Sequence, residues 1–148
     1  MADHIYKRYN KTLLIYHIVC PVKYRRNVFT EETEQTLKRI CLELGIRYDI
    51  EFLEIGIDGD HVHFLVQLVP NKCISDTVKL IKSITAKHMF RHHPEVKRFL
   101  WGGNFWTMGY YANTVGQYGN LAMISNYVKK QGSPDYKQIH HQMPSLFD

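Results

Sequence analysis

A very short turn between two strand-like segments is the feature that most restricts how this chain can fold. Residues 47–57 have the alternating pattern of a strand, Asp58-Gly59 is a turn signal, and a second strand is expected over residues 61–69, closed by Pro70 and Asn71. A turn of this length joins neighbouring antiparallel strands, whereas parallel strands need a long crossover. The sequence therefore predicts a β-hairpin, and with it an antiparallel sheet.

The other expected elements lie on both sides of this hairpin. Thr30 is a plausible N-cap and Gly45 a plausible C′ residue for an amphipathic helix, Ser75 can cap a second helix, and Gly116 begins the turn into a last one. The expected elements are a strand at 12–19 ended by Pro21, a helix at 31–44, a helix from 75 to about 92, an aromatic-rich strand at 105–113 and a helix at about 117–131. Residues 1–11 are expected to be a loose lead-in, and 133–148 a flexible polar tail.

The order β-α-β-β-α-β followed by an extra helix is that of the ferredoxin-like, or RRM-like, α+β plan. In this plan both core helices cover one face of the antiparallel sheet, which leaves the opposite face available for a site. The 148 residues suit one domain covering the whole chain. The three cysteines suit reduced thiols, and the longest apolar runs are too short to span a bilayer, so a cytoplasmic protein is expected.

The charge and the aromatic content favour a nucleic-acid partner. The formal net charge is +5, the pI is about 9.1, and there are ten tyrosines and two tryptophans. Cationic side chains attract phosphates, and flat rings offer surfaces on which bases can stack. A merely basic protein remains the alternative at this point.

Two histidines on the second hairpin strand form a candidate metal site. His61 and His63 are two residues apart, so on a strand their imidazoles point to the same face and can hold one divalent ion. Gln131 is the natural candidate for a further ligand. It lies four residues after Tyr127, and on a helix these two would share a face, which would place a phenol beside a Lewis acid. Such a pair could attack a phosphodiester and leave a phosphotyrosine ester.

Several segments resemble one family, the HUH endonucleases, and within it the single-tyrosine transposases of the smallest bacterial insertion sequences. His61-Val62-His63 is similar to the family's His-hydrophobic-His signature. Tyr16-His17-Ile18-Val19 and Lys23-Tyr24-Arg25-Arg26 resemble its first strand and basic loop, and the resemblance runs from about Leu13 to Gly132. Its later parts are Phe105-Trp106, Gly109-Tyr110-Tyr111, Thr114-Val115-Gly116, Tyr127 and Gln131. One departure is Val22, which stands between Pro21 and the basic loop where the family commonly has none.

The resemblance implies an enzyme that cleaves and rejoins single-stranded DNA at insertion-sequence ends and recognises a hairpin near each end. It implies that Tyr127 is the nucleophile of a 5′-phosphotyrosine link, and that His61, His63 and Gln131 bind Mg²⁺ or Mn²⁺. It also implies a homodimer, in which the histidines of one subunit can face the tyrosine helix of the other.

Basic residues are the candidate DNA contacts, with a solvated surface as the alternative reading. They lie in the basic loop (Lys23, Arg25, Arg26) and on the second helix (Lys79, Lys82, Lys87, Arg91). Asp58 and Asp60 could orient an imidazole, although a turn role is favoured for both. His92-His93 and His140-His141 are adjacent pairs that point apart, so no metal role is assigned to them.

Other functions would use some of the same residue patterns. An RNA-recognition module would fit the plan, but an RNP-type run is missing and the histidine pair would lack a purpose. A two-histidine phosphoesterase needs a second histidine motif, and a His-x-His amidohydrolase needs a barrel of about 250 residues. A domesticated nuclease associated with repetitive extragenic palindromes would share the chemistry, and the chain alone does not separate it from a transposase.

Overall fold

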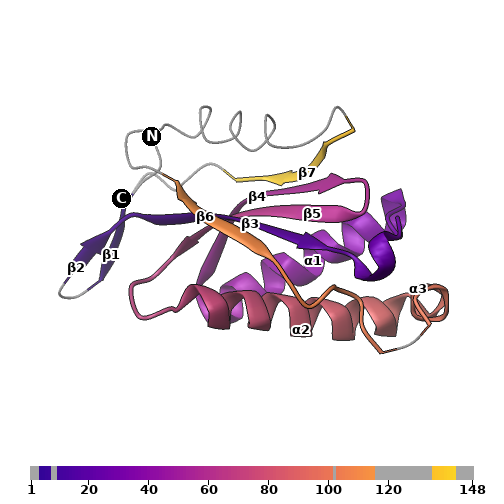
Figure 1. Cartoon of the computed structure of the whole chain (residues 1–148). Coiled ribbons are helices and arrows are strands. Elements are labelled where there is room, and N and C mark those ends of the chain that lie inside the picture. Colours follow the sequence, from indigo (N-terminus) through magenta and orange to yellow (C-terminus); the bar gives the residue numbers. More distant parts are fainter. Residues whose placement is uncertain (1–3, 8–9, 102, 116–134, 143–148) are drawn as a thin grey trace.

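A five-stranded antiparallel sheet forms the centre of the computed structural model, which describes residues 4–7, 10–101, 103–115 and 135–142 (Figure 1). The strand order is β6-β3-β5-β4-β7, and every neighbouring pair is antiparallel. The strands are β3 (Leu14–Pro21), β4 (Ile50–Asp58), β5 (His61–Leu68), β6 (Tyr111–Val115) and β7 (Lys137–His141). The first four have the order expected for the ferredoxin-like plan, so the predicted α+β fold class is confirmed.

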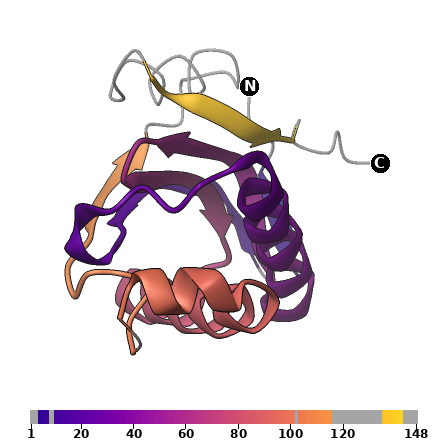
Figure 2. The same cartoon turned by 90° about the vertical axis from the view of Figure 1, so that its right-hand side faces the viewer.

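Two long helices cover one face of this sheet, as Figure 2 shows in the end-on view. They are α1 (Glu31–Tyr48) and α2 (Ile74–His92), followed by the short helix α3 (Pro94–Phe99). A single 3-10 turn, η1 (Lys23–Arg25), follows β3. None of the helices in the described ranges is long and apolar enough to cross a membrane.

The helix boundaries follow the sequence signals only in part. Thr30 is the N-cap of α1 as predicted, and its hydroxyl accepts from the Thr33 backbone N–H within a capping box. Gly45 is not the C′ residue. It lies inside α1, where an added Cβ would stand 2.5 Å from the Ile50 carbonyl oxygen, so the glycine allows close packing rather than a helix end. Ser75 is also misassigned as a cap, because α2 begins at Ile74 with Cys73 as N-cap.

The residues of β4 and β5 divide between the two sheet faces. Phe64 and Val66 of β5 pack against the helices, whereas Leu65 joins Ile15 and Leu53 in a small cluster on the opposite face. Within β4 the pairing to β5 shifts between Phe52 and Glu54, which marks a β-bulge. The opposite face also carries His61 and His63, the two histidines of the predicted site.

Three segments differ from the sequence-based expectations. The aromatic strand is shorter than predicted: β6 begins at Tyr111, and Phe105 and Trp106 are buried beside the start of η1, where Trp106 forms an isolated bridge with Val22. The lead-in contains a small hairpin, β1 (Ile5–Lys7) with β2 (Asn10–Thr12). The prediction of a flexible tail is wrong for residues 137–141, which form strand β7 and pair with β4 at the edge of the sheet. The predicted last helix at about 117–131 lies outside the described residues.

Candidate metal centre

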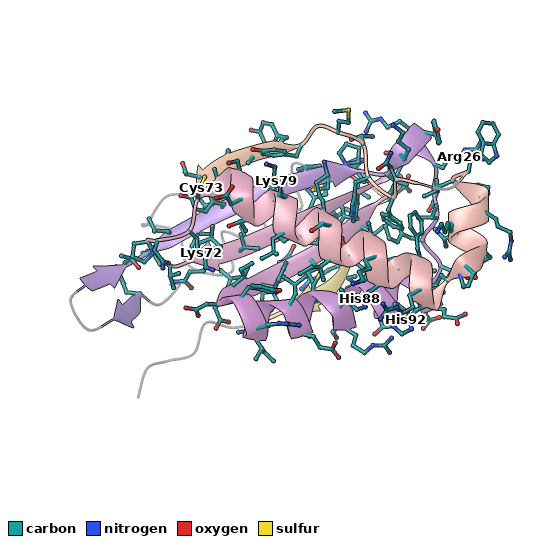
Figure 3. The ribbon with its side chains drawn as sticks, turned by 90° about the horizontal axis from the view of Figure 1, so that it is seen from below. Arg26, Lys72, Cys73, Lys79, His88 and His92 are labelled. Atoms are coloured by element: carbon teal, nitrogen blue, oxygen red, sulfur yellow. The ribbon has the colours of Figure 1, made fainter. Side chains whose placement is uncertain are left out.

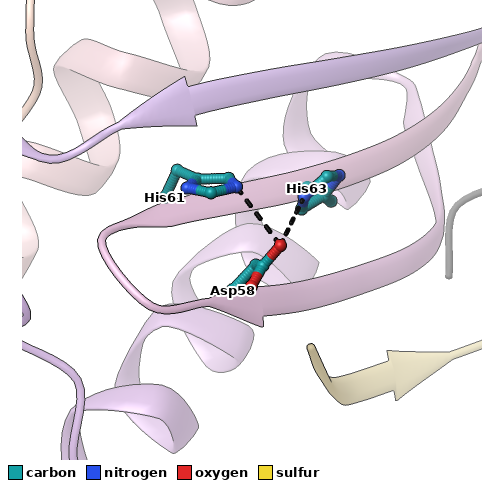
Figure 4. A group of neighbouring side chains, drawn as sticks. All are labelled: Asp58, His61 and His63. Carbon is teal, nitrogen blue, oxygen red and sulfur yellow. Dashed lines mark ion pairs between the residues drawn. The ribbon is translucent and has the colours of Figure 1, made fainter. Parts of the chain in front are cut away.

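His61, His63 and Asp58 bring three possible metal ligands together at one end of the β4–β5 hairpin (Figure 4). The hairpin register places Asp58 directly opposite His61 and Gly56 opposite His63, so both histidines and the carboxylate share a sheet face. Asp58 Oδ2 lies 3.4 Å from His61 Nε2 and 3.7 Å from His63 Nε2. The three donor atoms lie within 4.8 Å of one another. The shared face predicted for the two histidines is thereby confirmed.

The donor set fits a divalent cation. Adjacent ligands of an octahedral Mg²⁺ lie about 2.1 Å from the ion and therefore about 3 Å from each other, which is within about 1 Å of the separations between Asp58 Oδ2 and the two imidazoles. His63 Nε2 is buried without a hydrogen-bond partner among the described residues. A buried polar atom without a partner costs free energy, and a cation between the rings would remove that cost. The site can therefore hold a divalent ion through these three residues.

His17 of β3 hydrogen bonds with the second ring nitrogen of His63, Nδ1. The His17 Nε2 and His63 Nδ1 atoms are 2.8 Å apart, and the two rings are nearly coplanar at 13°. When His63 Nε2 offers its lone pair to a cation, the ring proton is on Nδ1, which then donates to His17 Nε2. His17 in turn hydrogen bonds with Asn113, its register partner on β6. This chain of contacts is compatible with the His63 tautomer that can bind metal.

Burial favours the neutral form of two neighbouring histidines, His63 and His17. The pKa of His63 is lowered to about 4, mainly because the ring is buried and also because His17 and His61 are close, while Asp58 opposes the shift. Burial likewise lowers the pKa of His17. A neutral imidazole has a free lone pair, so near neutral pH a cation does not have to compete with a proton for His63.

Asp58 and Asp60 have different positions around the histidines. Asp60 Oδ1 lies 2.9 Å from His61 Nδ1, and a proton on this nitrogen would leave Nε2 free for a cation. Asp60 therefore contacts and orients an imidazole, whereas the sequence favoured a turn role for it. Asp58 was assigned mainly to a turn, but it is the last residue of β4, it is buried, and its carboxylate is one of the three donors. Sequence reasoning missed this role because a DG pair reads as a turn.

Tyr136 closes one side of the site and was also missed, because it falls in the segment predicted to be a tail. Its ring lies edge-on to His63 at a centroid distance of 5.4 Å, and its hydroxyl donates to Glu54 Oε2 at 2.6 Å. The ring occupies the space above Gly56, where an added Cβ would overlap the tyrosine. Glycine at position 56 therefore lets Tyr136 contact His63. The pairing of residues 137–141 with strand β4 could not be predicted from the sequence, because this edge strand is short and polar.

The remaining predicted site residues are dispersed. Tyr127 and Gln131 lie outside the described residues, so their contact with the histidines stays a prediction. Lys82 is half-exposed, and its Nζ is engaged by the protein itself, because it donates to the backbone oxygens of Thr107, Met108 and Gly109 at 2.6, 3.2 and 3.3 Å. The other predicted DNA contacts lie at the surface on η1, in the residue after it and on α2, and Figure 3 shows Arg26 and Lys79 among them.

Comparison with known proteins agrees with this geometry. The family model described as "Transposase IS200 like" matches residues 10–131. The ISDra2 transposase TnpA of Deinococcus radiodurans is 36% identical over 118 residues, which cover 80% of this chain and 84% of the relative. The transposase for insertion sequence element IS200 of Salmonella typhimurium is 31% identical over 120 residues, covering 81% and 78%.

Two solved structures share the fold. The crystal structure of a candidate transposase from Deinococcus radiodurans has a TM-score of 0.70 and 31% identity, and the match covers 87% of this chain and 98% of that one. A REP-associated tyrosine transposase bound to a REP hairpin has a TM-score of 0.54 and 16% identity, with 85% and 67% covered. The second likeness shows the fold alone. Together with the histidine pair at the start of β5, the matches confirm the resemblance seen in the sequence: the chain belongs to the IS200-like family of single-tyrosine HUH transposases.

Proposed function

We propose that this transposase cleaves and rejoins single-stranded DNA at insertion-sequence ends, with Tyr127 as the nucleophile. The observation that carries the proposal is the pairing of neutral, buried His63 with His61 and Asp58 on a sheet face that the helices leave open. The residues that match the family model extend to position 131 and so include Tyr127 and Gln131. The DNA strand would approach on this open face.

The proposed reaction exchanges one phosphodiester for another. The Tyr127 oxygen bonds to phosphorus, the bond from phosphorus to the 3′ oxygen breaks, and the phenol proton passes to solvent while the leaving oxygen ends as a 3′-hydroxyl. The DNA remains joined to the protein through a 5′-phosphotyrosine ester. Attack by a second 3′-hydroxyl reverses the step and restores the tyrosine, so the exchange needs no external energy source.

The proposed cofactor is Mg²⁺ or Mn²⁺. His61, His63 and Asp58 would hold it, with Gln131 as a further ligand from the tyrosine segment. A bound divalent ion would stabilise the charge that develops on the phosphate oxygens. The carboxylate of Asp58 supplies the negative charge that an all-imidazole set would lack, and oxygen ligands are those that Mg²⁺ and Mn²⁺ prefer.

The proposed substrate carries a hairpin near the cleavage point, and the active form is a homodimer. A solved structure of the same fold, a REP-associated tyrosine transposase, is bound to a REP hairpin, which supports hairpin recognition by this fold. Each chain provides one nucleophilic tyrosine, Tyr127, whereas joining two DNA ends requires two cleavages. Two chains would therefore act together. Light scattering at micromolar concentration should give twice the chain mass of 17.5 kDa, and a monomer under these conditions would contradict the dimer.

The proposed function is tested by trapping the covalent link. The full chain is mixed with Mg²⁺ and labelled single strands that tile both sides and both strands of the DNA flanking its coding sequence. One or more tiles should give a labelled protein band that survives SDS, and Tyr127→Phe should abolish it. The proposal fails if every tile leaves the protein unlabelled, or if the Phe variant labels as well as the wild type.

The histidines are tested by separating cleavage from binding. His61→Ala and His63→Ala should abolish the SDS-resistant band. Affinity for the same strand should stay within about threefold of the wild type, because these side chains bind the metal and contribute little to DNA binding. His92→Ala, at an exposed position on α2, is the matched control and should cleave normally. Equal loss of binding in a folded His63→Ala protein would refute the ligand assignment.

A further inference from the structure

Four exposed or half-exposed side chains gather beside the turn that precedes His61. They form a cluster that we call the aromatic platform: Tyr24, Arg26, Phe99 and Trp101. Their rings are unusually open to solvent, with exposed fractions of 53% for Tyr24, 47% for Phe99 and 76% for Trp101. Large exposed aromatic groups in contact with one another commonly mark a binding surface.

Contacts within the platform join its members into one layer. The Arg26 guanidinium carbon lies 4.8 Å from the centroid of the Phe99 ring and 5.3 Å from that of the Trp101 ring. The rings of Tyr24 and Trp101 are 5.9 Å apart between centroids. Figure 3 shows Arg26 reaching toward the end of the molecule that carries α3. A guanidinium between rings is itself a flat surface with π character, so Arg26 extends the layer rather than interrupting it.

The backbone displays these rings at some conformational cost. Tyr24, Arg25 and Trp101 have φ values of 62°, 54° and 55°, in the left-handed region that residues other than glycine rarely adopt. The turn is fixed by backbone hydrogen bonds from Lys23 N to Phe105 O and from Val22 N to Asp60 O, each 2.8 Å long. A left-handed turn at Tyr24 and Trp101 sends both side chains outward, where they add little to the core. Both rings are therefore available for contact at the surface.

The charge around the platform selects the partner. Five cationic residues lie on η1, on α3 or next to these elements in sequence: Lys23, Arg25, Arg26, Lys97 and Arg98. Two acidic residues, Asp60 and Glu95, partly offset this positive charge. Lys23 Nζ is 5.5 Å from the Tyr24 ring. A protein partner would favour an apolar centre depleted of charge, whereas rings interleaved with cations suit bases and phosphates at the same time. Bases are free to stack only where they are unpaired.

The platform is also linked to the metal site. Arg25 Nη1 lies 3.9 Å from Asp60 Oδ1, and the same carboxylate oxygen is 2.9 Å from His61 Nδ1. Arg25, which stands between Tyr24 and Arg26 in sequence, thus connects the platform to the carboxylate that contacts His61. We propose that Tyr24, Arg26 and Trp101 form a stacking site for one or two unpaired bases of the single strand that is cleaved. The proposal rests on the proposed function for its DNA partner and adds a base-binding site that the metal chemistry does not require.

Tryptophan fluorescence gives a direct test, because the two tryptophans of the chain differ in exposure. Trp101 is exposed whereas Trp106 is 5% exposed, so quenching by a bound base reports on Trp101. Oligothymidylate of about ten nucleotides, a length within the range of single-strand binding sites, is titrated into the full chain of Tyr127→Phe, which removes cleavage. Emission should fall on binding, and the corresponding Trp101→Phe protein should show no such quenching.

Affinity gives the second measurement. Trp101→Ala should weaken oligothymidylate binding about tenfold, as expected for one lost stacking contact, while affinity for a blunt duplex should stay unchanged. Ile46→Ala is the matched control, since Ile46 is 88% exposed on α1 outside the platform. Unchanged affinity of Trp101→Ala, or equal weakening for single strand and duplex, would overturn the stacking site.

The two proposals fail in different ways. A covalent adduct together with normal oligothymidylate binding by Trp101→Ala would leave the transposase reaction standing and refute the platform. Base-dependent quenching without an adduct on any flanking strand would support the platform and refute the reaction.

Discussion

His17 and His63 share a buried hydrogen bond of 2.8 Å across neighbouring strands, although they are 46 residues apart in sequence. Val19 is the direct register partner of His63, so His17 reaches it diagonally along β3. The contact makes the second histidine of the HUH pair dependent on the first strand of the sheet. The geometry of the metal site is therefore set by tertiary packing as well as by the hairpin.

Removing the His17 acceptor should weaken metal binding. In His17→Phe the ring volume is kept, but His63 Nδ1 loses its partner, and we expect Mn²⁺ affinity to fall about tenfold or more. His17→Gln can still offer an acceptor oxygen and should recover part of the loss. The affinity is measured by electron paramagnetic resonance of free Mn²⁺, and nitrogen NMR of the imidazoles should show a changed tautomer at His63. Wild-type Mn²⁺ affinity in a folded His17→Phe protein would contradict a role for His17 in supporting the His63 ligand.

Replacing the buried carboxylate should also weaken the site. Asp58→Asn keeps the shape of the side chain and removes its negative charge, so Mn²⁺ affinity should fall at least about tenfold. Asp76→Asn, which removes an exposed carboxylate at the start of α2, is the matched control and should leave the affinity unchanged. Calorimetry on the metal-free protein gives both values. Equal Mn²⁺ affinities for Asp58→Asn and the control would show that Asp58 is not a metal ligand and would leave it only a structural role in the turn.

Gly56 should tolerate no side chain while Tyr136 stays in place. Gly56→Ala should lower the free energy of unfolding by about 1–3 kcal/mol, because the new methyl group overlaps the Tyr136 ring. Gly103→Ala is the control, since an added Cβ there meets open space, and its effect should stay within about 0.5 kcal/mol. Urea denaturation measures both. The cost of Gly56→Ala should shrink in a Tyr136→Ala background, and an unchanged cost would place the clash elsewhere.

The metal-free protein should lose stability in mild acid. The pKa of His63 is lowered to about 4 by burial, against 6.5 for an exposed histidine, and the pKa of His17 is lowered in the same direction. As the pH falls from 6.5 toward 4 the unfolded chain binds protons that the folded protein does not, so the free energy of unfolding decreases in this range. Above pH 6.5 the two histidines contribute no slope.

Urea denaturation with a chelator at pH 7.5 and pH 5 would show this loss. His63→Gln lacks one of the two imidazoles with the lowered pKa values described above and should lose less stability between these values than the wild type does. Identical losses in both proteins would show that other groups are responsible.

The sequence predicted those parts of the molecule that depend on local patterns. The Asp58-Gly59 turn, the Thr30 cap and the periodicity of α1 each involve residues close together, so the order of elements and the shared face of His61 and His63 followed. The roles of His17 and Tyr136 depend on contacts between distant segments, which no local pattern records. The boundary errors have the same origin, since Gly45 reads as a helix end until the packing of Ile50 against it is known.

The β-bulge in β4 decides which side of the sheet receives the Asp58 carboxylate. Before the bulge Phe52 faces the helices, and after it Ile55 and Ile57 do, so the extra residue exchanges odd and even positions. Deleting the extra residue at the bulge would restore an uninterrupted alternation and leave Asp58 opposite His61 on the same face. Keeping the residue but losing the bulge would instead turn Asp58 toward the helix-covered core and bring Ile57 to the histidines. Relatives with one residue fewer in this strand should therefore lack the bulge and keep their carboxylate at the corresponding position.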